Sequence, residues 1–213
     1  MIDPVLIVDY GMGNVASVLN AFTRLGVKAR LSDRPQEISA ARSLVLPGVG
    51  AFGEAVEEID RRDLRKPIVG AVRGGASLLG ICLGMQLLFD VSDENEGTQG
   101  LGLLHGRVRR LPGGVRVPHI GWNQIEDLRP APILKGLEPG EHLYFVHSYY
   151  VEPLPELVVA WVDYGLRFAA VAGSGKVWGI QPHPEKSQRP GETILRNFIG
   201  LSDTGGKSGE ICA

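Results

Sequence analysis

The stretch LLGICLGMQLLF, residues 78–89, decides the fold that the sequence predicts. Its first half is a short apolar run and its second half carries apolar residues at helical spacing, so the pattern predicts a buried strand that turns directly into a helix. Between the two halves stands Cys82, flanked by Gly80 and Gly84 in the pattern G-x-C-x-G. Glycines permit the sharp strand-to-helix turn known as a nucleophile elbow, which would leave the thiol exposed at a helix N-terminus.

Two interpretations of Cys82 follow from this turn. In the functional one, the unpaired N–H groups at the start of the helix favour the thiolate, and the N–H of Leu83 is aimed at an oxyanion formed by attack on a carbonyl. In the structural one, Cys82 is a small buried apolar residue, as most free cysteines are. The pentapeptide alone leaves both open.

Outward from this turn, the N-terminal part of the chain alternates predicted strands and helices. Residues 5–10 read as a buried strand, residues 15–26 as an amphipathic helix, and residues 43–53 as a strand followed by a glycine-rich loop. Such alternation indicates an α/β fold with a mostly parallel central sheet and helices on both faces. After residue 96, short β-like pieces separated by Gly and Pro predict an antiparallel extension, and residues 191–200 predict a closing helix. We therefore expect one three-layer domain over residues 1–200.

Composition limits the classes of function. The chain has 213 residues, 44% apolar and 22% charged, with a net charge of −2 and no basic patch that would suit nucleic acid. Two cysteines without a CxxC pattern argue against a metal site or a disulfide framework and suit the reducing cytoplasm. The apolar stretch 68–89 contains Arg73 and several glycines, so no membrane span is expected. The small and polar residues of segment 201–213 predict a disordered tail, in which Cys212 would be an exposed thiol without a catalytic role.

A thiolate nucleophile needs a base, and His183 in GIQPHPEKS is the strongest candidate among five histidines. Glu185 follows two positions later, and in extended backbone residues i and i+2 point the same way. Glu185 would therefore hold one ring nitrogen of His183 while the other faces the thiol. The alternative is a surface loop without a catalytic role.

Three glycine patterns suggest nucleotide binding. GMGNVA, residues 11–16, satisfies the dinucleotide fingerprint, with Asp33 as the acidic residue downstream. GSGKV, residues 173–177, and GGKS, residues 205–208, lack the glycine or hydroxyl residue that a phosphate loop requires.

LLGICLGMQLLF together with GIQPHPEKSQRPGETILRNF resembles the class I, or triad, glutamine amidotransferases. Within that class, DYGMGN, LPGVGAFG, PHIGWNQ and YFVHSYY are similar to the glutaminase subunits of imidazole glycerol phosphate synthases, which serve histidine biosynthesis. The resemblance runs from about residue 5 to residue 199. It implies a flavodoxin-like sheet, no cofactor, and a Cys82–His183–Glu185 triad that hydrolyses L-glutamine through a thioester.

The same resemblance implies roles for further residues. The oxyanion would take one N–H from Leu83 and another from Val49 or Gly50, where a peptide flip would open and close the hole. The residues implied around the substrate are Gln86, Glu94, Tyr144, Ser148 and Tyr149. Glu96 is an alternative to Glu94, because DENEGTQ allows either alignment.

The family members dock on a (βα)8-barrel synthase subunit, which receives the ammonia, so a heterodimer is implied. The positions that match the interface are Asn14, Trp122, Asn123 and Lys186. Without the resemblance, Trp122 would be read as a core aromatic; with it, an exposed anchor is expected. The GMGNVA turn would then face the partner subunit.

Pro182 departs from the family pattern, which has an aromatic residue before the histidine. Because proline fixes φ and has no N–H, the backbone position of His183 should differ slightly from that in the family.

Three alternatives for the function stay open. The chain could serve another synthase, such as pyridoxal phosphate synthase, it could be a nucleotide-binding module, or it could be a regulatory subunit without catalysis. The intact Cys82, His183 and Glu185 argue against the last.

Overall fold

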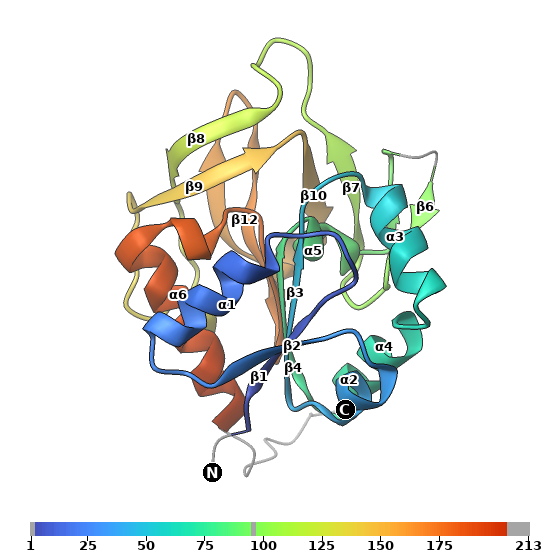
Figure 1. The fold of residues 1–213 in the computed structure, drawn as a ribbon. Coiled ribbons are helices and arrows are strands. Elements are labelled where there is room, and N and C mark those ends of the chain that lie inside the picture. Colours follow the sequence, from blue (N-terminus) through green and yellow to red (C-terminus); the bar gives the residue numbers. More distant parts are fainter. Residues whose placement is uncertain (1–2, 95–96, 204–213) are drawn as a thin grey trace, which may run out of the picture.

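The computed structural model describes residues 3–94 and 97–203, built around a seven-stranded sheet (Figure 1). Five strands run parallel in the order β2-β1-β3-β4-β13, and β12 and β11 extend the sheet antiparallel beyond β13. The strands are β1 (Val5–Val8), β2 (Ala29–Ser32), β3 (Ser43–Gly48), β4 (Ser77–Cys82), β11 (Val158–Asp163), β12 (Arg167–Ser174) and β13 (Val177–Ile180). Every residue of β3 and β4 is buried, as expected for parallel strands covered on both faces.

Helices cover both faces of this sheet. In Figure 1, α1 and α6 lie on one side, and α2, α3 and α4 on the other. Each side encloses its own apolar core, one including Phe22 and Phe198 and the other including Phe52 and Ile68. The helices are α1 (Val15–Arg24), α2 (Pro35–Ala40), α3 (Phe52–Arg61), α4 (Arg65–Arg73), α5 (Leu83–Leu87) and α6 (Gln188–Asp203). The predicted three-layer α/β architecture is therefore confirmed.

Two small sheets lie beyond the carboxyl ends of the parallel strands. One has the order β10-β7-β5-β6 and the other is the two-stranded ribbon β8-β9. Their strands are β5 (Val91–Ser92), β6 (Thr98–Gln99), β7 (Gly106–Arg110), β8 (His119–Gln124), β9 (His142–His147) and β10 (Tyr149–Pro153). Short 3₁₀ turns complete the chain: η1 (Pro132–Leu134), η2 (Pro155–Leu157) and η3 (Pro184–Lys186). In Figure 1 the ribbon β8-β9 lies above α1 and α6.

The last helix is longer than predicted. It continues to Asp203, so residues 201–203, which we assigned to the tail, are helical. Leu201 continues the apolar spacing of Ile194 and Phe198 and packs against the same core, which explains the extension. The remainder of the predicted tail, with Cys212 and GGKS, lies outside the described residues. Among the helices of the described ranges, none is both long and apolar enough to cross a membrane.

Candidate active site

The turn between β4 and α5 has the geometry of a nucleophile elbow. Cys82 adopts φ 55° and ψ −111°, a sparsely populated conformation that costs on the order of 1–3 kcal/mol for a residue with a side chain. The flanking glycines allow three backbone segments to meet. A β-carbon on Gly80 would lie 2.5 Å from the carbonyl oxygen of Gly84, and one on Gly84 would lie 1.7 Å from the carbonyl oxygen of Leu46 in β3. The G-x-C-x-G pattern is therefore required by close packing of the elbow against its neighbouring strand.

This packing predicts a large effect of Gly84→Ala. The new methyl group would overlap the Leu46 carbonyl, and both are held by backbone that cannot easily move, so we expect a loss of about 3 kcal/mol or more in the free energy of unfolding. Gly70→Ala is the matched control, because Gly70 lies in α4 with open space around it and should gain roughly 0.5–1 kcal/mol. Urea denaturation of both variants measures the difference. Equal stabilities would show that the elbow is not tightly packed.

The predicted base and its orienting carboxylate are in contact. Nδ1 of His183 lies 2.7 Å from Oε1 of Glu185, and both side chains are almost fully buried. The reason for this pairing differs from our expectation, because residues 184–186 form the turn η3 and are not extended. The backbone N–H of His183 donates to the carbonyl of Tyr144 at 2.8 Å, which ties the histidine to β9. Pro182, which has no N–H, leaves this bond undisturbed.

The charges around His183 favour an imidazolium. Burial by itself lowers the pKa of His183, but the nearby Cys82 and the hydrogen bond to Glu185 outweigh burial and raise it to about 9. Glu185 occupies Nδ1, while Nε2 of His183 is buried and has no hydrogen-bond partner among the described residues, so Nε2 is the nitrogen left available to the Cys82 thiol. The arrangement suits a thiol that transfers its proton to the ring.

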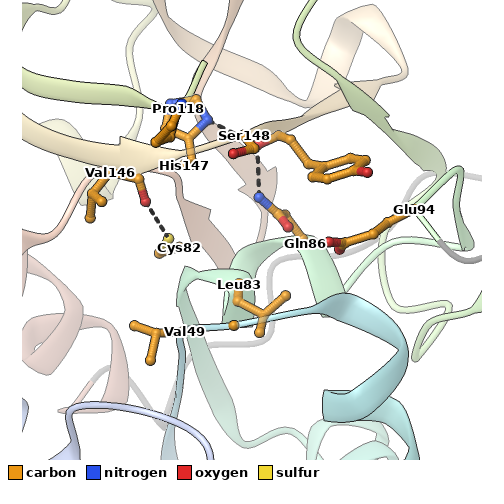
Figure 2. A pocket seen from close by; sticks show the side chains of 11 residues that line it. Val49, Cys82, Leu83, Gln86, Glu94, Pro118, Val146, His147 and Ser148 are labelled. Carbon is orange, nitrogen blue, oxygen red and sulfur yellow. Dashed lines mark hydrogen bonds between the residues drawn. The ribbon is translucent and has the colours of Figure 1, made fainter.

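A pocket of about 270 Å³ opens over the elbow (Figure 2). Its size is near the lower end for ligand sites and suits a small metabolite. It brings together the predicted nucleophile, both oxyanion segments and most of the predicted substrate residues. These are Val49, Gly50, Cys82, Leu83, Gln86, Glu94, Ser148 and Tyr149. In Figure 2, Cys82 faces Val146 of β9, whose carbonyl lies 3.7 Å from the sulfur.

Glu94 has a structural contact that the sequence did not indicate. Its Oε2 accepts a hydrogen bond of 2.8 Å from the N–H of Phe52, the first residue of α3. The carboxylate therefore both lines the pocket and fixes the end of the segment that contains Val49 and Gly50. Glu96, the alternative, lies outside the described residues.

Tyr144 is placed differently from our prediction. It does not line the pocket over Cys82 but lies on the outer face of β9, with its ring 5.8 Å from that of Trp122. The ammonium group of Lys186 lies 5.7 Å from the centre of the Tyr144 ring. The side chains of β9 alternate between faces, and the predicted role ignored this alternation. Tyr144 thus belongs with two residues that we assigned to a partner interface.

The other two predicted interface residues make contacts within the chain. Asn14 is exposed and caps α1, since its Oδ1 accepts from the N–H of Ser17. Asn123 points to the opposite face of β8 from Trp122, and its Nδ2 donates to the carbonyl of Asp163 at 2.8 Å. Trp122 itself is 47% exposed, so it is not the core aromatic that would be expected without the resemblance.

The glycine-rich segments that suggested nucleotide binding have other surroundings. A β-carbon on Gly13 would meet the backbone of Gly48, and one on Gly50 would meet the side chain of Met12. The GMGNVA turn therefore packs against the predicted oxyanion segment. GSGKV forms the hairpin turn between β12 and β13, where the ammonium group of Lys176 donates to the carbonyl of Gly75. Within residues 3–94 and 97–203, no three His, Cys, Asp or Glu side chains gather as a metal site would require.

A buried histidine pair went unnoticed in the sequence. Nδ1 of His119 lies 3.2 Å from Nε2 of His147, and Nδ1 of His147 lies 2.9 Å from the carbonyl of Tyr149. A carbonyl only accepts, so His147 donates to it from Nδ1 and accepts from His119 at Nε2. His147 also lines the pocket. The strand alternation in HIGWNQ and YFVHSYY, which puts both histidines on the inner face, was the available signal.

Both histidines of this pair are held neutral. Burial lowers the pKa of His119 to about 4. Burial also lowers the pKa of His147 to about 3, against the opposing effect of its bond to the Tyr149 carbonyl. His119 stacks between the rings of Tyr164 and Phe145, at 3.8 and 5.0 Å. The two neutral rings therefore keep fixed hydrogen bonds to each other and to the Tyr149 carbonyl beside the pocket.

Comparison with known proteins agrees with this geometry. A family model described as glutamine amidotransferase class-I matches residues 6–201. A protein of Moorella thermoacetica named imidazole glycerol phosphate synthase subunit HisH is 47% identical, over 97% of this chain and 99% of its own length. One of the same name from Geobacillus kaustophilus is 51% identical over 92% and 96%.

Solved structures share the fold. One described as a glutamine amidotransferase superposes with a TM-score of 0.75 at 23% identity, over 93% of this chain and 99% of the other. A structure of PurLQS from Thermotoga maritima gives 0.74 at 20% identity, over 94% and 99%. On the family match and the two HisH relatives, the chain belongs to the class I glutamine amidotransferase family.

Proposed function

We propose that the chain hydrolyses the side-chain amide of L-glutamine and passes the ammonia to a (βα)8-barrel synthase subunit that makes imidazole glycerol phosphate. The observation that carries the proposal is the strained Cys82 beside the buried His183–Glu185 pair, at a pocket of small-metabolite size. The name shared by the relatives supports the choice of synthase. A free thiol nucleophile must stay reduced, which suits the cytoplasm.

In the first half of the reaction, Cys82 Sγ attacks the amide carbon of the substrate while its proton passes to Nε2 of His183. The tetrahedral intermediate collapses when His183 returns the proton to the leaving nitrogen, which departs as ammonia and leaves a γ-glutamyl thioester. Glu185 accepts from Nδ1 throughout, so the ring keeps one orientation and its positive charge is stabilised.

In the second half, water attacks the thioester carbon and gives its proton to His183. The carbon–sulfur bond then breaks, glutamate leaves, and His183 returns the proton to the sulfur. The N–H of Leu83 and one N–H from the segment at Val49 and Gly50 would stabilise the negative oxygen in both halves. Loss of one such donor costs roughly 3–4 kcal/mol of barrier.

The surface beside the pocket suits a protein partner. Ile120, Trp122 and Val49 are 57%, 47% and 43% exposed, which is unusual for large apolar side chains. Ile120 and Trp122 pair across the ribbon with Val146 and Tyr144. Because the Val146 carbonyl touches the thiol, the ribbon that meets the partner also covers the nucleophile. A docked partner would thus receive ammonia directly and be able to adjust the site.

Glutamate release tests the proposal. We would compare the chain alone, with the barrel subunit, and with that subunit and its ribulotide ligand, and we expect strong stimulation in the last case. Trp122→Ala should weaken binding of the barrel subunit by about 2 kcal/mol, roughly 30-fold, as loss of an interface anchor does. Leu154→Ala is the matched control, since Leu154 is 43% exposed on a different element. Full activity without the partner, or equal losses in the two variants, would contradict the proposed complex.

A further inference from the structure

A buried amide side chain, which no step of the reaction above uses, touches the sulfur of Cys82. Gln181 follows β13, two residues before His183, and is fully buried. Its Nε2 lies 3.7 Å from Cys82 Sγ, and its Oε1 lies 3.2 Å from Nε2 of Gln86. Burying a neutral amide is costly unless its polar atoms are bonded, so these contacts define its place in the fold.

The orientation of the Gln181 amide follows from a backbone carbonyl. Tyr149 O only accepts, and it lies 2.9 Å from Gln86 Nε2. The NH₂ of Gln86 must therefore face both Tyr149 O and Gln181, which makes the facing atom of Gln181 its carbonyl oxygen. The NH₂ of Gln181 is then left to point at the sulfur. The orientation is thus determined by hydrogen-bond donors and acceptors, since a flip would place two NH₂ groups against each other.

Two groups hold the sulfur in different ways. The Val146 carbonyl can only accept, so it bonds the neutral thiol and gains nothing from the thiolate. The Gln181 NH₂ can only donate, and a donor bonds an anion about twice as strongly as it bonds a neutral atom. When the proton leaves the sulfur for His183, the bond from Gln181 strengthens as the bond to Val146 is lost.

We propose that Gln181 is a further catalytic residue, whose amide donates a hydrogen bond to the Cys82 thiolate and holds it toward the pocket. The proposal rests on Cys82 being the nucleophile. Gln86 and the Tyr149 carbonyl position Gln181, and His147, which is itself bonded to His119, donates to the same carbonyl. This chain of contacts links the buried histidine pair to the nucleophile.

The test follows the alkylation of Cys82 by iodoacetamide as a function of pH. A Cys212→Ser background leaves Cys82 as the only cysteine of the chain. Gln181→Met keeps the size of the side chain and removes the donor, and we expect the midpoint of the alkylation profile to rise by about one pH unit. That shift corresponds to a tenfold loss of thiolate. In glutamine turnover, kcat should fall about tenfold with KM little changed.

The control is Ile180→Val, which trims the fully buried last residue of β13, directly before Gln181, without removing a hydrogen bond. Its alkylation midpoint should match that of the parent. The other ionisable groups that lie around the pocket, or that act on Cys82 directly or through His183, are the same in all variants. They are Tyr10, Glu94, His147, Tyr149, His183 and Glu185.

If Gln181→Met fails to fold, Gln86→Met provides the second test. It removes the group that orients the Gln181 amide, so the midpoint should rise in the same direction by a smaller amount. An unchanged midpoint in the folded Gln181→Met protein, or in Gln86→Met where Gln181→Met does not fold, would overturn the proposal. Alkylation needs neither glutamine nor a partner, so this outcome is separate from a failure of the parent protein to release glutamate.

Discussion

Cys82→Ser should lower glutamine hydrolysis by at least about a thousandfold in the complex with the barrel subunit. A serine hydroxyl ionises far less readily than a thiol, so His183 cannot generate the nucleophile at neutral pH. The smaller oxygen fits the site of the sulfur, and the backbone conformation of the elbow stays the same. Synthesis driven by added ammonia should therefore continue at the parent rate, because ammonia bypasses the glutaminase step.

Cys212→Ser is the matched control for this experiment. It makes the same chemical change at the second cysteine, which lies outside the described residues, and we expect full glutamine-dependent activity. Glutamate release and ammonia-driven synthesis are measured side by side for both variants. A Cys82→Ser protein that retained a tenth of the parent activity would exclude a thioester on this residue.

Acidification from pH 6.5 to 4.5 should lower the free energy of unfolding by roughly 2–4 kcal/mol through the buried histidine pair. The pKa of His119 is lowered to about 4 and that of His147 to about 3, both chiefly by burial. Each ring is therefore neutral in the folded protein and protonated in the unfolded chain over this range. The stability they contribute is present above pH 6.5 and is lost as the pH falls toward the folded values.

Other groups with shifted pKa values do not change the stability between pH 4.5 and 6.5. The pKa of His183 is raised to about 9, so its contribution is fully present below pH 6.5 and is lost only as the pH rises through about 9. Hydrogen bonds from arginines lower the pKa values of Glu37 and Glu58, whose contributions are lost below about pH 4.5. The change in the free energy of unfolding between pH 4.5 and 6.5 therefore reports on the His119–His147 pair.

Urea denaturation at several pH values measures the slope of the free energy of unfolding against pH. His147→Gln keeps one donor and one acceptor but does not titrate, so the slope should fall by about half. His142→Gln is the control, because His142 is exposed at the start of β9 and is hydrated in both states, and its slope should equal that of the parent. A slope in His147→Gln equal to that of the parent would show that the pair is not held neutral by the fold.

The sequence alone determined those features that rest on short-range rules. Alternating apolar patterns predicted the three-layer sheet, because each strand and helix must bury a continuous apolar face. The G-x-C-x-G spacing predicted the elbow at Cys82, because only glycine permits backbone to approach that closely. His183 and Glu185 were paired because they are close in sequence, although the turn that joins them was not foreseen.

Only the tertiary structure decided the contacts that join distant segments. Strand alternation separates Tyr144 and Trp122 from Asn123, but which of the two faces points outward depends on what packs against the ribbon. Gln181 meets a sulfur 99 positions earlier in the chain, and His119 meets His147 across 28 positions. Hydrogen bonds between buried polar groups arise when the strands assemble, so residue spacing predicted where the nucleophile lies, while the fold selected the groups that hold it.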